Sequence, residues 1–168
     1  ILILFFFTTF LEKNVFANDI YFIDYSKVMN ESTAGKKAQK VLSNLLKSSN
    51  KKFNDTAKKL KEEENQIISQ KNVLTKDDYR KKADELRKKV FDLNKQREKS
   101  LKDIASKRKK AGDEMLKNLN PILGKYMEEK NITVIIDKKN VLMGNKKYEI
   151  TSQIIEILNK NLKSINLN

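Results

Sequence analysis

The residue types needed for common catalytic and metal sites are largely missing from this sequence. It contains no His and no Cys, which excludes a Ser-His-Asp triad, a His-Glu-x-x-His zinc site, a thiolate metal site and a disulfide framework. Its four glycines lie too far apart for a phosphate-binding loop. We interpret the acidic run Glu62–Glu64 as a solvated helix face. We therefore expect a protein that is not an enzyme and that uses no metal and no cofactor.

The chemistry that remains is that of clustered positive charge. The net charge is +14, and the stretch Lys36–Glu129 holds 27 Lys or Arg against 15 Asp or Glu, which is +12 of that total. Such a field speeds the capture of acidic partners and keeps a protein soluble. A compositional bias toward Lys explains part of the magnitude, but not its location in one region. The candidate binding residues are Arg80, Lys81, Lys82, Arg87, Lys88, Lys89, Lys107, Arg108, Lys109 and Lys110.

A second candidate group is apolar and lies near the end of the same region. Two interpretations are open: packing of a helix against its partner, or a soft lining for apolar segments, where flexible Met is useful. The residues concerned are Met115, Leu116, Leu119, Ile122 and Leu123.

These residues belong to a long helical stretch, residues 34–129, in which apolar side chains recur at steps of three or four. Thr75, followed by Asp78, resembles a capping box that starts a second helix, which predicts an antiparallel hairpin with its tip near residues 71–76. In its first half the stripe is Ala38, Leu42, Leu45, Ser49, Phe53, Ala57, Leu60, Glu64, Ile67, Lys71 and Leu74. In its second half it is Tyr79, Ala83, Leu86, Val90, Leu93, Arg97, Leu101, Ile104, Arg108, Ala111, Met115 and Leu119.

Polar residues interrupt this predicted seam, so we expect weakly packed arms that bend and splay. The interruptions are Ser49, Glu64, Lys71, Arg97 and Arg108. A plain pair of solvated spacer helices is the alternative.

The two ends of the chain show strand patterns. Ile20–Asp24 predicts a strand buried on both faces, followed by a turn of helix near residues 26–29. Strands are also predicted at Ile132–Asp137, at Val141–Met143 and at residues 147–150. Thr151 or Ser152 is predicted to cap a last helix with one apolar face, formed by Ile154, Leu158, Leu162 and Ile165.

Residues 18–33 and 130–168 would form a small β-body of 55 residues. A module of this size buries only ~60% of its unfolded surface and is marginal alone. We therefore expect several copies to complete one body. The residues assigned to that shared body are Ile20, Phe22, Ile23, Val134, Ile135, Ile136, Val141 and Leu142.

The first residues have the pattern of a signal peptide. The apolar run Ile1–Leu11 is shorter than the ~20 residues that span a bilayer. Val15 and Ala17 fit a peptidase cut between Ala17 and Asn18, so residues 1–17 are predicted to direct export. A buried helix or an uncleaved anchor is the alternative.

Two motifs resemble those of the Skp (OmpH) family of periplasmic chaperones. The first combines Ile23-Asp24 and Lys27-Val28 with a turn at Glu31–Lys36, in which Thr33 replaces the family's usual Pro. The second is an Asp-Lys-x-x-Val-Leu turn starting at Asp137, followed by Glu149-Ile150-Thr151, where Glu149 replaces an Asp. The resemblance covers essentially the whole chain after the predicted signal, and the motifs at both ends agree in order and spacing.

This resemblance implies a jellyfish-like homotrimer of the α+β class, mostly helical, with long antiparallel coiled-coil hairpin arms that project from a shared β-body. It implies a periplasmic, ATP-independent holdase for unfolded outer-membrane β-barrel proteins. Some members bind lipopolysaccharide, so anionic lipid or lipopolysaccharide is a further partner that it implies.

Two other functions fit the composition. A basic coiled coil that binds nucleic acid agrees with a pI near 9.7. Against it stand the signal-like start and the absence of a basic region forking from a continuous zipper, so we expect no nucleic-acid partner. A structural spacer of the cell envelope is the third possibility.

Overall fold

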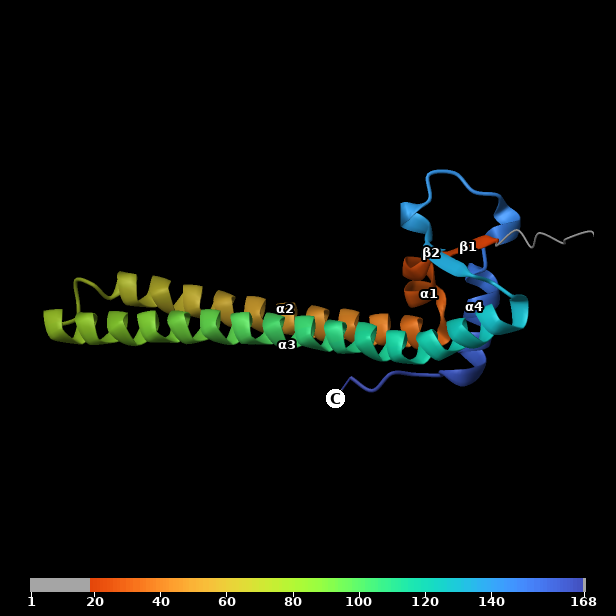
Figure 1. The fold of residues 1–168 in the computed structure, drawn as a ribbon. Helices are drawn as coiled ribbons and strands as arrows, with labels where there is room; N and C mark the ends of the chain where they lie inside the picture. Colours follow the sequence, from red (N-terminus) through yellow and green to blue (C-terminus); the bar gives the residue numbers. More distant parts are fainter. Residues whose placement is uncertain (1–18, 168) are drawn as a thin grey trace, which may run out of the picture.

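The structure is a computed structural model that describes residues 19–167. Figure 1 shows a long hairpin of two helices, α2 (Thr33–Ser69) and α3 (Lys76–Lys130), projecting from a small body. The other elements form that body: β1 (Ile20–Ile23), α1 (Tyr25–Glu31), β2 (Val134–Asp137), the short 3-10 turns η1 (Lys138–Asn140) and η2 (Lys146–Tyr148), and α4 (Thr151–Asn161). The mostly helical α+β fold with an antiparallel hairpin is confirmed. The predicted signal peptide and its cut between Ala17 and Asn18 lie outside the described residues.

The sheet of the body joins the two ends of the chain. β1 and β2 pair in parallel, with Ile20 opposite Val134 and Ile23 opposite Asp137. Parallel neighbours need a long crossover, and here the whole hairpin provides it. On the other side of β1, the Ile150 N–H donates to the Phe22 carbonyl at 3.0 Å. β1 is therefore flanked on both sides, whereas the outer edge of β2 has no strand beside it among the described residues.

The core lies where the base of the hairpin meets α1, α4 and the sheet. It contains eight buried residues: Ile23, Val28, Ala34, Met115, Leu119, Ile150, Ile154 and Leu158. Because Met115 and Leu119 sit in this core, the last third of α3 belongs to the body as much as to the arm. The marginal body thus gains apolar area from the arm that it supports.

The junction between α1 and α2 explains the turn motif at Glu31–Lys36. The Gly35 N–H donates to the buried Ser32 hydroxyl at 3.2 Å, so Ser32 caps α2. A Cβ atom on Gly35 would lie 1.8 Å from the Met29 carbonyl oxygen. Only glycine therefore allows α2 to start this close to α1.

The tip of the hairpin has the local structure that the sequence predicts. α2 ends at Ser69, and Thr75 caps α3 by accepting from the Asp78 N–H at 3.1 Å while its hydroxyl donates to the Asp78 carboxylate at 2.7 Å. At the other end, α3 continues through Pro121, and its last turns bend toward the sheet in Figure 1. A proline inside a helix removes one backbone hydrogen bond and favours such a bend.

Two of the strand predictions at the C-terminal end are wrong. Val141–Met143 forms no strand, and Leu142 and Met143 are almost fully exposed. The Asp137 carboxylate accepts from the Lys139 N–H at 3.1 Å and starts η1, which turns the chain away from the sheet. The strand expected at residues 147–150 is reduced to η2 and a single bridge between Glu149 and Phe22. Ile20 is also exposed, so burial on both faces holds only for the end of β1.

The predicted cap of the last helix is also wrong. Ile150 precedes α4 without a side-chain cap, and Thr151 is its first residue. The Thr151 hydroxyl instead accepts from the Asp24 N–H at 2.9 Å and donates to the Glu149 carboxylate at 3.2 Å. It is thus used to satisfy the backbone at the end of β1. α4 ends at Asn161, so Leu162 and Ile165 lie beyond the helix.

Candidate binding surface of the hairpin

The seam between α2 and α3 contains both apolar and polar contacts. Phe53 and Ile67 are the buried side chains of the distal half of α2. Between them and the base, the Ser49 and Ser100 hydroxyls hydrogen bond across the seam at 2.7 Å. Farther out, the ammonium of Lys89 on α3 lies 2.6 Å from the carboxylate of Glu63 on α2. Ser49 therefore occupies the seam as expected, and polar pairs replace apolar packing over part of it.

The predicted seam of α3 is wrong over part of its length. Ser100 rather than Leu101 faces α2, and Leu101 is 45% exposed. Arg97 and Arg108 are exposed, and so is Lys71, which follows the end of α2. The apolar pattern points to Leu101 because Leu is apolar and Ser is not. Neighbouring residues of a helix point about 100° apart, so Leu101 lies away from α2 when Ser100 faces it.

The ten candidate cations lie on α3, and several have partners. Arg87 lies 2.6 Å from Asp84, and Arg80 is 4.0 Å from the same carboxylate. Lys109 pairs with Asp113 at 2.6 Å, and Lys107 donates to the Leu167 carbonyl. Lys82 donates to Gln70 across the tip at 3.5 Å. The pairs with Asp84 and Asp113 neutralise part of the positive charge locally.

The remaining cations are more available to a partner. Within residues 19–167, Lys81, Lys88 and Arg108 have no carboxylate within ion-pair distance, and all three are exposed. Lys110 is exposed on α3 as well, but it has an interaction partner of its own. Lys81 and Lys88 line one shallow groove near the tip, which they share with the acidic side chains of Asp77, Asp84 and Glu85.

Charged neighbours along α3 also perturb each other's protonation. The Lys102 ammonium lies 2.7 Å from the Glu98 carboxylate, one turn away. This hydrogen bond lowers the pKa of Glu98 and raises the pKa of Lys102. Both groups are exposed, so the pair contributes little to stability.

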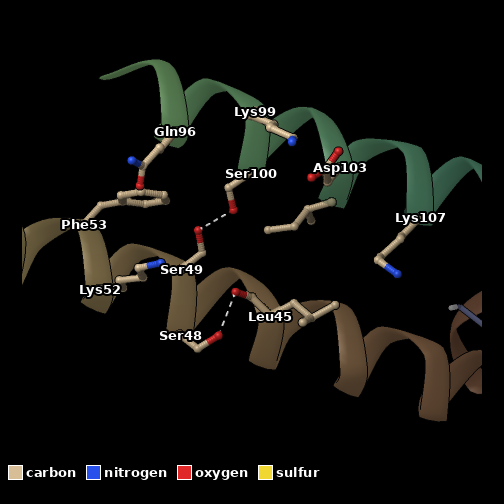
Figure 2. Close-up of a pocket in the computed structure, with 11 residues that line it drawn as sticks. Leu45, Ser48, Ser49, Lys52, Phe53, Gln96, Lys99, Ser100, Asp103 and Lys107 are labelled. Atoms are coloured by element: carbon tan, nitrogen blue, oxygen red, sulfur yellow. Dashed lines mark hydrogen bonds between the residues drawn. The ribbon is translucent and has the colours of Figure 1, made fainter. Parts of the chain in front are cut away.

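A groove of about 460 Å³ opens between α2 and α3 of the hairpin, beside Ser49 and Ser100. Figure 2 shows Ser49 and Ser100 meeting at the seam, with the ring of Phe53 beneath Gln96 at one end. Lys52, Lys99 and Lys107 border the groove, with Asp103 as the acid among its lining residues. It thus combines apolar side chains (Leu45, Phe53 and Ile104) with a cationic border.

A second groove, of about 660 Å³, lies farther out along the hairpin. Leu60, Leu86, Val90 and Phe91 are among the residues that line it. Phe91 is 67% exposed, and it lies off the apolar stripe that the sequence predicts for this helix. A large aromatic residue on an otherwise polar helix face was the signal that could have found it.

The apolar candidates at the base of α3 are mostly covered. Met115 and Leu119 are buried in the core, and Ile122 and Leu123 pack against it. Leu116 is exposed. For Met115, Leu119, Ile122 and Leu123, these positions favour packing within the chain over an open lining for apolar segments.

The residues assigned to the shared body separate into two groups. Phe22 and Ile23 are buried within one chain, and Ile135 and Val141 are half-buried. The others are exposed, namely Ile20, Val134, Ile136 and Leu142. The structure therefore leaves apolar side chains uncovered on and beside the sheet.

The described part of the chain contains neither a metal-binding cluster nor a membrane-spanning helix. Among residues 19–167, no group of three or more His, Cys, Asp or Glu side chains is placed to hold a metal ion. No helix in that range is long and apolar enough to cross a membrane. The acidic run at Glu62–Glu64 makes ion pairs instead, with Lys61 and with Lys89.

Comparisons with known proteins agree with this architecture. A family model described as outer membrane protein (OmpH-like) matches residues 19–158. No curated protein sequence gives a significant match. A crystal structure described as an outer membrane chaperone (OmpH-like) from Caulobacter crescentus CB15 is similar to this chain, with a TM-score of 0.80. The alignment covers 88% of this chain and 87% of that chain at 17% identity, which establishes a common fold.

Proposed function

This chain belongs to the OmpH-like outer membrane protein family, and from that premise we propose that it is an ATP-independent holdase chaperone of the periplasm. Its clients would be unfolded outer-membrane β-barrel proteins, kept soluble between the hairpin arms until they reach the membrane. The similar Caulobacter structure carries the description of an outer membrane chaperone, which agrees with this proposal.

One observation carries the proposal. The arms combine a net charge of +12 with grooves and apolar side chains that their own seam leaves uncovered. A positive field speeds the encounter with acidic partners. Many weak contacts, rather than one deep pocket, would hold a client that must later be released without nucleotide hydrolysis.

We propose a homotrimer as the working assembly. The outer edge of β2 lacks a strand beside it in the described chain, and Ile20, Val134, Ile136 and Leu142 are exposed around the sheet. An open strand edge with apolar neighbours favours association with further copies. In this assembly residues 18–33 and 130–168 would form the shared body, and residues 34–129 would form each arm.

The compartment follows from the same proposal. Residues 1–17 would act as a signal peptide that directs the chain to the periplasm. Anionic lipid or lipopolysaccharide would be a further partner of the cationic arms. A protein found in the cytoplasm would point instead to the nucleic-acid-binding alternative.

The test is suppression of aggregation. An outer-membrane β-barrel protein is diluted from urea with and without the mature chain, and light scattering is followed at low and high salt. We expect suppression at one trimer per client, and weaker suppression at high salt, because screening shortens the range of the arm charges. Unchanged scattering at a stoichiometric trimer would instead support a structural spacer.

Charge variants locate the effect on the arms. Lys81→Glu with Lys88→Glu changes the net charge by the same amount as Lys146→Glu with Lys160→Glu in the body, and all four residues are exposed. We expect only the arm variant to suppress aggregation less well. Equal effects of the two variants would assign the result to net charge alone.

A further inference from the structure

The C-terminal segment packs against both helices of the hairpin near the root of the hairpin. After α4 ends at Asn161, the following residues run without helix or strand back along the hairpin, as Figure 1 shows. Leu167 is 6% exposed and packs in one cluster with Ala38 and Leu42 of α2 and Ala111 of α3. Ile165, two residues earlier, packs against the same cluster. A non-helical segment with apolar residues two positions apart is thus held against both helices.

One backbone contact fixes this segment as well. The Lys107 ammonium donates to the Leu167 carbonyl oxygen. A cation on α3 therefore binds the main chain of the tail, while the apolar cluster binds its side chains. The hairpin thus binds both the main chain and every second side chain of this segment, as expected for a site that binds an extended strand.

The seat of the tail is continuous with the 460 Å³ groove. Ile104 packs against the tail cluster and also lines the groove, and Lys107 lines the groove while it holds Leu167. On α2, Leu45 of the groove lies three residues, or about one helical turn, beyond Leu42 of the cluster. The groove between α2 and α3 thus extends from the contact site of the C-terminal segment toward Phe53.

The groove has room because the seam is built from small side chains at this level. Ser49 and Ser100 close the seam with their 2.7 Å hydrogen bond, where larger residues would fill the space in Figure 2. Lys52, Lys99 and Lys107 outnumber Asp103 along the border. The groove therefore suits a segment that presents apolar side chains inward and carboxylates outward.

We propose that this groove binds an extended segment of unfolded polypeptide with apolar residues at every second position, and that the chain's own tail occupies its inner end and competes with that segment. The inference rests on the proposed function, since it names the client surface on the arm. The tail's own seat favours polypeptide over lipid as the occupant, because Lys107 engages a backbone carbonyl.

Site-specific photocrosslinking tests the groove in the full mature chain. The sequence has no Cys, so single cysteines carrying a benzophenone can be placed at will. Ser48→Cys and Lys99→Cys put the probe in the groove, whereas Asn50→Cys and Arg97→Cys put it on exposed positions outside the groove lining of the same helices. The ligand is a twelve-residue acidic peptide with alternating Leu. The control peptide has the same composition with its leucines grouped.

We expect the alternating peptide to crosslink about tenfold more at Ser48→Cys and Lys99→Cys than at the two control positions, the factor gained by burying one further apolar side chain. Leu167→Asp should raise this yield severalfold, because it removes the tail from its seat. Ending the chain after Lys163 should have the same effect and guards against an indirect effect of the new charge.

Four results would overturn the inference. Equal yields at all four positions would show that the groove is not selective, and no response to either tail variant would exclude competition. Labelling by a photoactivatable fatty acid without labelling by the peptide would make the groove a lipid site. Aggregation suppression without groove labelling would refute only this inference. Groove labelling without suppression would support it while refuting the proposed function.

Discussion

At the scale of the residue, Gly35 has the strictest requirement in the body. Gly35→Ala should lower the free energy of unfolding by about 3 kcal/mol, because its Cβ would collide with the Met29 carbonyl oxygen of α1. Urea unfolding followed by tyrosine fluorescence measures this change, since four of the five tyrosines lie outside the distal arms, at Tyr21, Tyr25, Tyr126 and Tyr148.

Gly112→Ala is the matched control for this substitution. A Cβ at Gly112 would meet no atom within 4 Å, so this variant should gain about 0.5–1 kcal/mol from its higher helix propensity. Similar effects of the two substitutions would contradict the close approach of α2 to α1.

Glu149 gives the body a predicted dependence on pH. The Lys138 ammonium donates to both of its carboxylate oxygens, at 2.9 and 3.0 Å, and this hydrogen bonding lowers the pKa of Glu149. A carboxyl whose pKa is lower in the folded than in the unfolded chain stabilises the fold above its unfolded pKa. That stability is lost as the pH falls below about 4.3, the ordinary pKa of Glu, toward the lower folded value.

Glu149→Gln should therefore reduce the loss of stability on acidification. The measurement is the urea midpoint from neutral pH down to about pH 3, below the ordinary Glu pKa of about 4.3, so that it covers the range in which the stability is lost. Glu156→Gln, on the exposed side of α4, is the control and should keep the dependence of the parent. An unchanged slope in Glu149→Gln would remove this carboxylate from the acid response.

At the scale of the element, the seam between the arms limits the stability of the hairpin. Ser49→Leu together with Ser100→Leu should raise the melting temperature of the helical signal, because two apolar side chains would fill the space between α2 and α3. Thermal melting followed by far-ultraviolet circular dichroism measures the change. Ser43→Leu with Ser106→Leu makes the same composition on exposed positions and should not raise it.

The sequence predicted elements well where local rules decide them. The hairpin and the capping interaction of Thr75 with Asp78 follow from periodicity and from contacts three residues apart. Thr151 was assigned wrongly as a cap because its partner, the Asp24 N–H, lies 127 positions away. Val141–Met143 was assigned wrongly as a strand for a similar reason: strand pairing depends on a neighbour that local sequence does not specify. In the seam, polarity did not reveal that Ser100 rather than Leu101 faces α2.

At the scale of the whole molecule, association of the bodies is the main prediction. Ile136→Lys with Leu142→Lys should reduce the native mass from three chains to one, because charges would lie beside the open edge of β2. Sedimentation at micromolar concentration measures the mass. Val73→Lys, at an exposed apolar position at the far tip of the hairpin, should leave the mass unchanged. A parent chain that sediments as one folded copy would contradict the shared body and the cavity between arms.

The parallel pairing of β1 with β2 also dictates the order in which the chain folds. Ile20 waits for Val134, which is synthesised 114 positions later, so the sheet cannot nucleate by itself. We therefore expect the hairpin, whose contacts start at a six-residue turn, to form first and to bring the two strands together at its open end. Until the sheet forms, Phe22 and Ile23, which are buried in the folded chain, remain exposed to solvent and prone to aggregation. The chain thus passes through a stage in which its own apolar strand is exposed, and that stage ends when the base of the hairpin closes around the sheet.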